Sequence, residues 1–280
     1  MPMISKLIDY LSYSFVQNAL LAGILISLCA SLIGTVLVLK KYSFIGESLS
    51  RTSFCAAAIA SILKMTTNLP IILIITIMVS FVLIMYGNKH KSDNEAVVAM
   101  VAVSSLAIGY ILINKFSGSA NVSGDVCTVL FGSTSILTLS TTDVWICVGL
   151  SIAVVVFCIL FHNYIFGISF DENFMKATGL NTVIYDAAIA VISAIVIVLA
   201  MNLVGSLLVT ALIVFPTLTA MKLFNSFKAV TIAAAVIAVL SSGFGIIASI
   251  LMSTPVGSTI VIFDLILFIL AAIFGKIRNH

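Results

Sequence analysis

The stretch LAGILISLCASLIGTVLVLKKYSFIGESLSR, Leu21 to Arg51, decides the fold class of this chain. Its first 19 residues carry no charged side chain, which is close to the about 20 residues that a helix needs to cross a bilayer. Two lysines end this apolar run, and a second segment follows that contains Glu47 and Arg51. The stretch therefore predicts two membrane-spanning helices, the second with charges inside it.

The same apolar pattern continues along the whole chain. Hydrophobic residues make up 62% of the 280 residues and charged residues 8%, whereas soluble domains have about 45–50% and about 25%. We expect an all-α, polytopic helical membrane protein with about eight or nine transmembrane helices in one integral domain, residues 1–280. Predicted spans cover residues 15–39, 43–63, 69–87, 96–114, 143–166, 183–203, 205–222, 228–251 and 256–275. The seventh is short and contains Pro216, a combination typical of discontinuous or re-entrant segments, which would leave eight spans.

The distribution of lysine and arginine predicts the orientation. With the N-terminus outside, nine of the 13 basic residues fall in inner segments, three in outer segments and Arg51 within a span. We therefore expect a multi-pass protein with its N-terminus outside and its C-terminus inside. The first residues lack the features of a cleaved signal peptide, so we also expect the N-terminus to be retained.

Several kinds of chemistry are not expected from this sequence. It contains no GxxxxGK[ST] phosphate loop, no HExxH and no GxSxG, so we do not expect an ATPase, a zinc protease or a serine hydrolase. The five cysteines show no CxxC spacing, and no block of basic residues suggests nucleic-acid binding. We expect a chain that is not an enzyme and that binds no cofactor of its own.

Glu47 and Arg51 are the most informative charges. A charge at the centre of a bilayer costs about 2.5–3.5 kcal/mol on insertion scales, so such groups normally face a bundle interior or an aqueous path. Their spacing of four residues puts them on one helix face, where they can pair, and Ser43 and Ser50 lie on or near that face. This polar stripe is either part of a transport pathway or a self-neutralising ion pair that fixes helix packing.

Asp264, in TIVIFDLILF, is the other carboxylate deep within a predicted span. Either it reaches the polar stripe as a pathway residue, or it hydrogen-bonds a neighbouring helix. Asp186 lies near the inner end of its span, and we expect it at the membrane interface.

Two segments are not predicted to span. Phe116 to Asp143 combines Gly, Ser and Thr with an apolar centre, which suits an external loop, either with a short re-entrant helix or simply solvated. FDENFMKATGL, Phe170 to Leu180, predicts a short cytoplasmic amphipathic helix. Asp171 and Glu172 suit its N-terminus, and Gly179 suits its C-cap.

Four stretches together resemble the membrane permease subunits of bacterial ABC importers for zinc and manganese. They are the opening stretch, VCTVLFGSTSILTLSTTDV, FDENFMKATGL, and VGSLLVTALIVFPTLTA followed by STPVGSTIVI. The blocks occur in the family's order and cover most of the chain from Phe15 to Phe274. The resemblance implies a permease in the bacterial cytoplasmic membrane that forms a homodimer, binds a separate ATPase and receives metal from an extracytoplasmic binding protein. ATP would be used by the partner subunit.

The resemblance also gives roles to individual residues. It places ATPase coupling on the 170–180 helix, at residues Phe170, Asp171, Glu172, Phe174, Ala177 and Gly179. The family's motif reads "GD.LSH", so its aspartate falls on Glu47, which is the candidate metal ligand here, and its histidine falls on Arg51. Arginine offers only hydrogen-bond donors and cannot replace an imidazole at a metal. Either Arg51 holds Glu47, or metal is handled elsewhere, or the cargo is different.

Our functional hypothesis is an importer permease for zinc, manganese or iron, which works by alternating access driven by the ATPase. One alternative keeps the fold and carries a chelated or anionic cargo through Arg51. Another is a secondary transporter that needs no ATPase.

Overall fold

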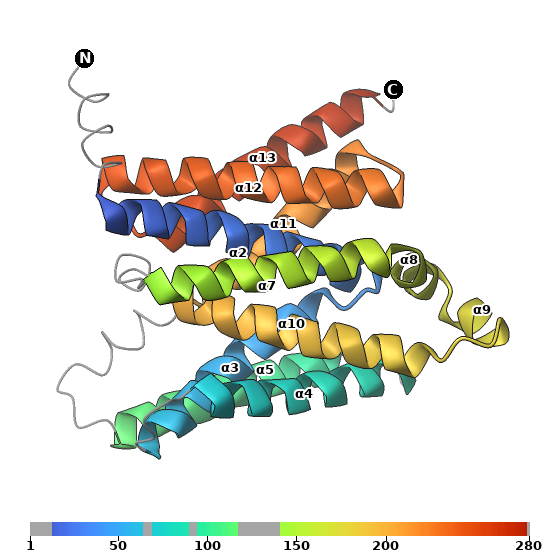
Figure 1. The fold of residues 1–280 in the computed structure, drawn as a ribbon, viewed down its shortest axis with the longest axis horizontal. Helices are drawn as coiled ribbons and strands as arrows, with labels where there is room; N and C mark the ends of the chain where they lie inside the picture. Colours follow the sequence, from blue (N-terminus) through green and yellow to red (C-terminus); the bar gives the residue numbers. More distant parts are fainter. Residues whose placement is uncertain (1–12, 64–68, 90–93, 117–140, 279–280) are drawn as a thin grey trace.

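A computed structural model of the chain describes residues 13–63, 69–89, 94–116 and 141–278, and every element within these ranges is an α-helix (Figure 1). The external segment predicted between Phe116 and Asp143 lies almost wholly outside the described residues. The helices are α2 (Ser14–Leu39), α3 (Ser43–Ile62), α4 (Leu69–Lys89), α5 (Asn94–Phe116), α7 (Thr141–Leu160), α8 (His162–Phe170), α9 (Glu172–Ala177), α10 (Thr182–Val204), α11 (Ser206–Leu223), α12 (Phe227–Met252) and α13 (Val256–Arg278).

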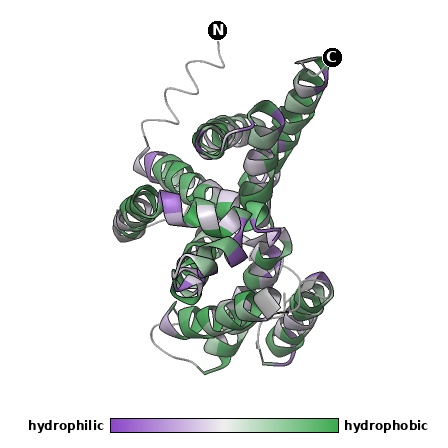
Figure 2. Cartoon of the chain, turned by 90° about the vertical axis from the view of Figure 1, so that its right-hand side faces the viewer, coloured by the Kyte–Doolittle hydropathy of each residue, from purple (hydrophilic) through white to green (hydrophobic). Residues whose placement is uncertain are grey.

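The helical membrane fold predicted from the sequence is confirmed. Among the described residues, seven helices are long and apolar enough to cross a membrane, and α7 with α8 forms an eighth candidate that is bent by 68°. Helix α3 is not one of them, because Glu47, Arg51 and its hydroxyl side chains lower its hydropathy. Hydrophobic residues dominate the helices of the bundle (Figure 2), and large apolar side chains such as Met78, Met100 and Trp145 are exposed on its outside. Such an outer surface suits contact with lipid.

Helix α2 forms the centre of the bundle. It contacts α7, α10, α11 and α12, and almost every residue from Cys29 to Val38 is buried. Small residues allow this close packing, as in other membrane helices. A Cβ atom at Gly34 would lie only 2.2 Å from the carbonyl oxygen of Ile213 in α11. Ser27 and Ser242 share a hydrogen bond of 2.9 Å between α2 and α12.

The other helices flank this centre in two groups (Figure 1). Helices α3, α4 and α5 pack together beside α10, and α11, α12 and α13 pack together on the other side of α2. Helix α3 also contacts α11, which connects the two groups. The cavity described below lies where these groups meet.

The expectation of a discontinuous seventh span is wrong. Helix α11 continues through Pro216, which is buried, and neighbouring helices α2, α12 and α13 pack around it. Such packing lets a membrane helix tolerate the loss of the backbone hydrogen bond that proline cannot donate. The helical structure is interrupted earlier, at Gly205, which has a φ of 93° and is the single residue between α10 and α11. Glycine adopts this positive φ without strain.

Asp186 is buried among the helices in the first turns of α10, and its position at the membrane interface stays a prediction. It forms an ion pair with Lys40, which follows the C-terminal end of α2. Both side chains are almost completely inaccessible, and the pair connects the end of α2 to the first turns of α10. The sequence does not show this partner, because the two residues are 146 positions apart.

Candidate functional site

The polar stripe of α3 faces a cavity of about 820 Å³. Ser43, Glu47, Ser50 and Arg51 all line it, as their spacing on one helix face predicts. The remaining wall comes from one further residue of α3, Phe44, and from α5, α11 and α13. Its residues are Phe44, Leu106, Ser206, Leu207, Thr210, Ala211, Val214, Phe215, Leu218 and Val261.

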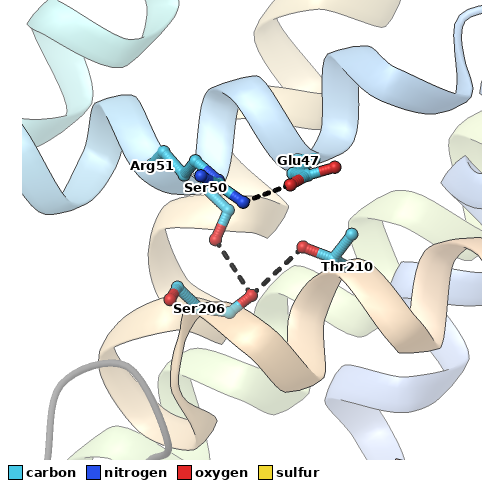
Figure 3. Close-up of polar contacts among 5 residues, drawn as sticks. All are labelled: Glu47, Ser50, Arg51, Ser206 and Thr210. Atoms are coloured by element: carbon cyan, nitrogen blue, oxygen red, sulfur yellow. Dashed lines mark hydrogen bonds and ion pairs between the residues drawn. The ribbon is translucent and has the colours of Figure 1, made fainter. Parts of the chain in front are cut away.

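Glu47 and Arg51 form the ion pair predicted from their spacing. The Nη2 atom of Arg51 donates a hydrogen bond to Oε1 of Glu47 (Figure 3). The pair does not lie in the packed core, because the two side chains keep 34% and 32% of their surface exposed. It therefore lies on the cavity wall, where a cargo ion could reach the carboxylate.

A hydroxyl group of α3 is hydrogen-bonded to the first turn of α11, at a carbonyl oxygen that also accepts a hydrogen bond within α11. The Oγ atom of Ser50 donates to the carbonyl oxygen of Ser206 over 3.1 Å, and Oγ1 of Thr210 donates to the same oxygen over 3.2 Å (Figure 3). Sequence reasoning missed Ser206 and Thr210, although both stand in the VGSLLVT segment that supports the family resemblance. Without the fold, nothing indicates that this segment meets α3.

The cavity offers oxygen ligands for a cation. Carboxylate and hydroxyl oxygens suit Mn²⁺ and similar divalent ions, whereas the guanidinium of Arg51 provides only donors. Among the described residues, no group of three or more His, Cys, Asp and Glu side chains could form a metal centre. Glu47 is the one carboxylate in the cavity lining, and it is already paired with Arg51.

Asp264 lies apart from this lining. Its side chain is buried in α13, with 1% of its surface exposed, and neither carboxylate oxygen has a hydrogen-bond partner among the described residues. Val261, three residues earlier on the same helix, does line the cavity. The structure therefore brings four of the five predicted pathway residues together in the cavity lining, whereas Asp264 does not line the cavity.

Comparison with known proteins identifies the family. The sequence model of the ABC 3 transport family matches residues 12–275. The chain belongs to the ABC 3 transport family. This confirms the resemblance to permeases of metal ABC importers that the sequence motifs indicated.

Relatives within the ABC 3 family match over nearly their full length. The manganese import system permease protein ScaB of Streptococcus parasanguinis is 30% identical over 274 residues, which cover 96% of this chain and 94% of the relative. The manganese transport system membrane protein MntC of Halalkalibacterium halodurans is 28% identical, with 95% and 89% covered. The solved structure of PsaBC from Streptococcus pneumoniae in complex with Fab has a similar fold, with a TM-score of 0.82 and 27% identity, covering 96% and 95%.

The ABC 3 chain presents a short helix at one end of the bundle. The predicted helix within residues 170–180 is present as α9, and α8 and α9 lie at the same end as the last turns of α13 (Figure 1). The carboxylate of Asp171 caps α9 by accepting a hydrogen bond from the backbone N–H of Phe174 over 3.0 Å. Gly179 follows with a φ of 85°.

The apolar side chains of the segment from residue 170 to residue 180 are largely exposed. Phe170 and Phe174 are 65% and 63% exposed, and Ala177 is also exposed. Glu172 begins the helix. Docking of an ATPase on this segment stays a prediction.

Proposed function

We propose that the chain is the transmembrane permease subunit of an ATP-driven importer for divalent transition metals, with manganese as the first candidate and zinc and iron as the others. The family supports the importer class, and two relatives are named as manganese transport proteins. The observation that carries the assignment to this chain is Glu47, a half-exposed carboxylate on the wall of a cavity of about 820 Å³ between helix groups. It is also the residue that falls on the aspartate of the motif "GD.LSH" by which the chain resembles its family, which supports its choice as the candidate ligand.

Glu47 would supply oxygen ligands to the passing ion. In the absence of cargo, Arg51 neutralises the carboxylate, so a cation has to compete with the guanidinium for it. This competition keeps binding weak, which suits a transport site that must also release its ion. Ser43 and Ser50 lie on the same face and add further oxygen atoms to the cavity.

The power for alternating access would come from a separate ATPase subunit. We place its docking site on α9 and the adjoining residues, because Phe170 and Phe174 present apolar surface there that the described part of the chain leaves exposed. A second permease copy and an extracytoplasmic metal-binding protein complete the proposed assembly. The N-terminus would be outside and the C-terminus inside the bacterial cytoplasmic membrane.

Metal accumulation in cells tests this function. Cells that express the chain with its ATPase and binding protein should accumulate more manganese than cells that lack the chain, and zinc and iron measured in parallel define the selectivity. Glu47→Ala should abolish the increase because it removes the carboxylate from the cavity. The control is Gly149→Ala, since a Cβ atom there meets nothing within 4 Å. Equal accumulation of all three metals with and without the chain would reject the proposal.

A further inference from the structure

Asp264, in the middle of α13, is an acidic group that forms no ion pair with any residue the structure describes. The other carboxylates in the interior of the described bundle are paired, Glu47 with Arg51 and Asp186 with Lys40. The hydroxyl of Ser241 in α12 lies next to Asp264, but it donates its hydrogen to the carbonyl oxygen of Ala238 over 3.1 Å. A buried carboxylate without a partner is costly within a membrane, which makes such a group a candidate for function.

Asp264 lies at the depth of the cavity. The rings of Phe215 in α11 and Phe268 in α13 are 6.2 Å apart, and a Cβ atom at Gly275 would lie 2.8 Å from the carbonyl oxygen of Lys222. In both pairs the α13 residue is numbered 53 higher than its α11 neighbour, so the two helices run parallel in one register. This register puts Asp264 level with Ala211, which lines the cavity.

A small movement of α13 would turn Asp264 into the cavity. Val261 lies on the cavity wall, and the two residues are three positions apart. On an α-helix this spacing corresponds to about 60° around the axis and about 4.5 Å along it. The Asp264 carboxylate is therefore level with the cavity along the axis of α13, and a small rotation of α13 separates it from the cavity wall.

A second carboxylate in the cavity would stabilise Arg51 whenever Glu47 binds a metal ion. Arg51 keeps its charge, so a metal ion that binds Glu47 displaces a guanidinium that then has no partner. The Arg51 side chain keeps 32% of its surface exposed on the cavity wall, but an unpaired charge within a membrane is still costly, so a second acidic group would remove this obstacle. Asp264 is the available carboxylate at the right depth among the described residues.

We propose that Asp264 is the alternate partner of Arg51 in the transport cycle. When α13 turns toward the cavity, Arg51 moves from Glu47 to Asp264, and the released Glu47 carboxylate binds the divalent cation. The exchange rests on the proposed metal transport and explains how a permease can carry a cation past an arginine. Asp264 acts through Arg51 and is a positioning residue, not a ligand of the metal.

A change of Asp264 tests this exchange, because its effect must depend on residue 51. Asp264→Asn keeps the shape of the side chain and removes its charge, and it should lower manganese accumulation roughly tenfold, within the range of coupling between charged neighbours. In an Arg51→Gln background the same change should have no further effect, since no guanidinium then needs a second partner. Equal losses in both backgrounds would overturn the proposal, because they indicate a packing role or direct metal binding.

The matched control is Ser241→Ala, which alters the polar neighbour of Asp264 without changing any charge. It should leave accumulation unchanged. The amount of each variant in the membrane and its binding to the ATPase are measured alongside. A loss with Ser241→Ala equal to that with Asp264→Asn would also overturn the proposal.

Cross-linking provides a readout that does not depend on transport. In a chain whose five native cysteines are replaced, Arg51→Cys and Asp264→Cys should be linked by a short bifunctional thiol reagent more readily when the permease–ATPase complex is held with a non-hydrolysable ATP analogue. The control pair combines Arg51→Cys with Leu265→Cys, because Leu265 is next to Asp264 and faces outward. Absence of a 51–264 link in every nucleotide state rejects the exchange. If no metal accumulates in any cell, the proposed function fails, while the cross-link still decides whether the two side chains meet.

Discussion

At the scale of single residues, position 51 sets the chemistry of the cavity. The family motif has a histidine there, which can ligate a metal through a ring nitrogen, and this chain has an arginine, which cannot. The guanidinium instead pairs with Glu47, one helical turn away. The pair leaves the cavity wall neutral and reduces the availability of the carboxylate to a cation.

Arg51→His should therefore strengthen metal binding. The change frees Glu47 and adds a nitrogen ligand one turn away, so we expect at least roughly tenfold tighter binding of Mn²⁺ or Zn²⁺, the size of effect that a change in local ligand support has on metal sites. Titration calorimetry on the purified complex measures the affinity, and Arg51→Gln is the control that frees Glu47 without adding a ligand. Equal affinities in the native chain and both variants would place the metal site elsewhere and leave the pair as a packing device.

At the scale of helices, close packing around α2 depends on small side chains. The backbone of α2 approaches α11 so closely at Gly34 that any Cβ atom would contact the Ile213 carbonyl group. Backbone cannot move aside as a flexible side chain can, so the helices must separate to make room.

Gly34→Ala should destabilise the bundle by about 1–3 kcal/mol, the usual cost of overpacking. The midpoint of thermal unfolding in detergent, followed by the loss of monodisperse protein, measures the effect. Gly149→Ala in α7 is the matched control, because open space surrounds that position. Similar midpoints for both variants would show that α2 and α11 can separate without loss.

Among the described helices, α9 has the least contact with the rest of the chain, and its main neighbours are α8 and α10. Asp171 caps it and Gly179 follows its end, so the sequence provides a defined short helix. Its side chain Phe174 and the adjoining Phe170 at the end of α8 are exposed. An apolar surface at an end of the bundle suits a protein partner.

Phe174→Asp with Ala177→Asp should dissociate or uncouple the ATPase, because charges would replace the apolar contact. Co-purification of the ATPase and its permease-stimulated activity are the measurements. Ser253→Asp is the control, since this residue is exposed, carries a positive φ that aspartate tolerates and lies between α12 and α13. An unchanged complex with unchanged stimulated activity would remove the coupling role from α9.

At the scale of the whole molecule, successive long helices run in opposite directions along the bundle (Figure 1). The Lys/Arg distribution predicts that the end with α8, α9 and the last turns of α13 faces the cytoplasm. This orientation determines whether α9 can meet an ATPase at all.

Cysteine labelling tests the orientation. A membrane-impermeant thiol reagent added to intact cells should modify Ser253→Cys, between α12 and α13, and should not modify Asn225→Cys, between α11 and α12. Both positions are exposed, so access to the reagent depends on the side of the membrane. Disrupted cells, in which both positions should react, are the control, and the reverse pattern would put α9 on the wrong side.

Local features of the chain were predictable from the sequence. Long apolar runs must be helical in a bilayer because their backbone groups have no other partners there, and eight of the nine predicted spans agree with the helices to within a few residues. The span predicted at 143–166 is instead divided into α7 and α8 by a bend of 68°. The Glu47–Arg51 pair follows from the helical repeat, and the α9 helix from its capping residues. These features involve residues within one or two turns of each other.

Contacts between distant segments were decided only by the tertiary structure. Asp186 pairs with Lys40, Ser50 bonds the carbonyl group of Ser206, and the carboxylate of Asp264 accepts no hydrogen bond from the residues that the structure describes. In an all-apolar bundle the hydrophobic pattern does not distinguish a helix face that meets lipid from one that meets another helix, since both are apolar. Which polar groups face the cavity, and which stay behind its wall, therefore follows from how the helices pack and not from their individual sequences.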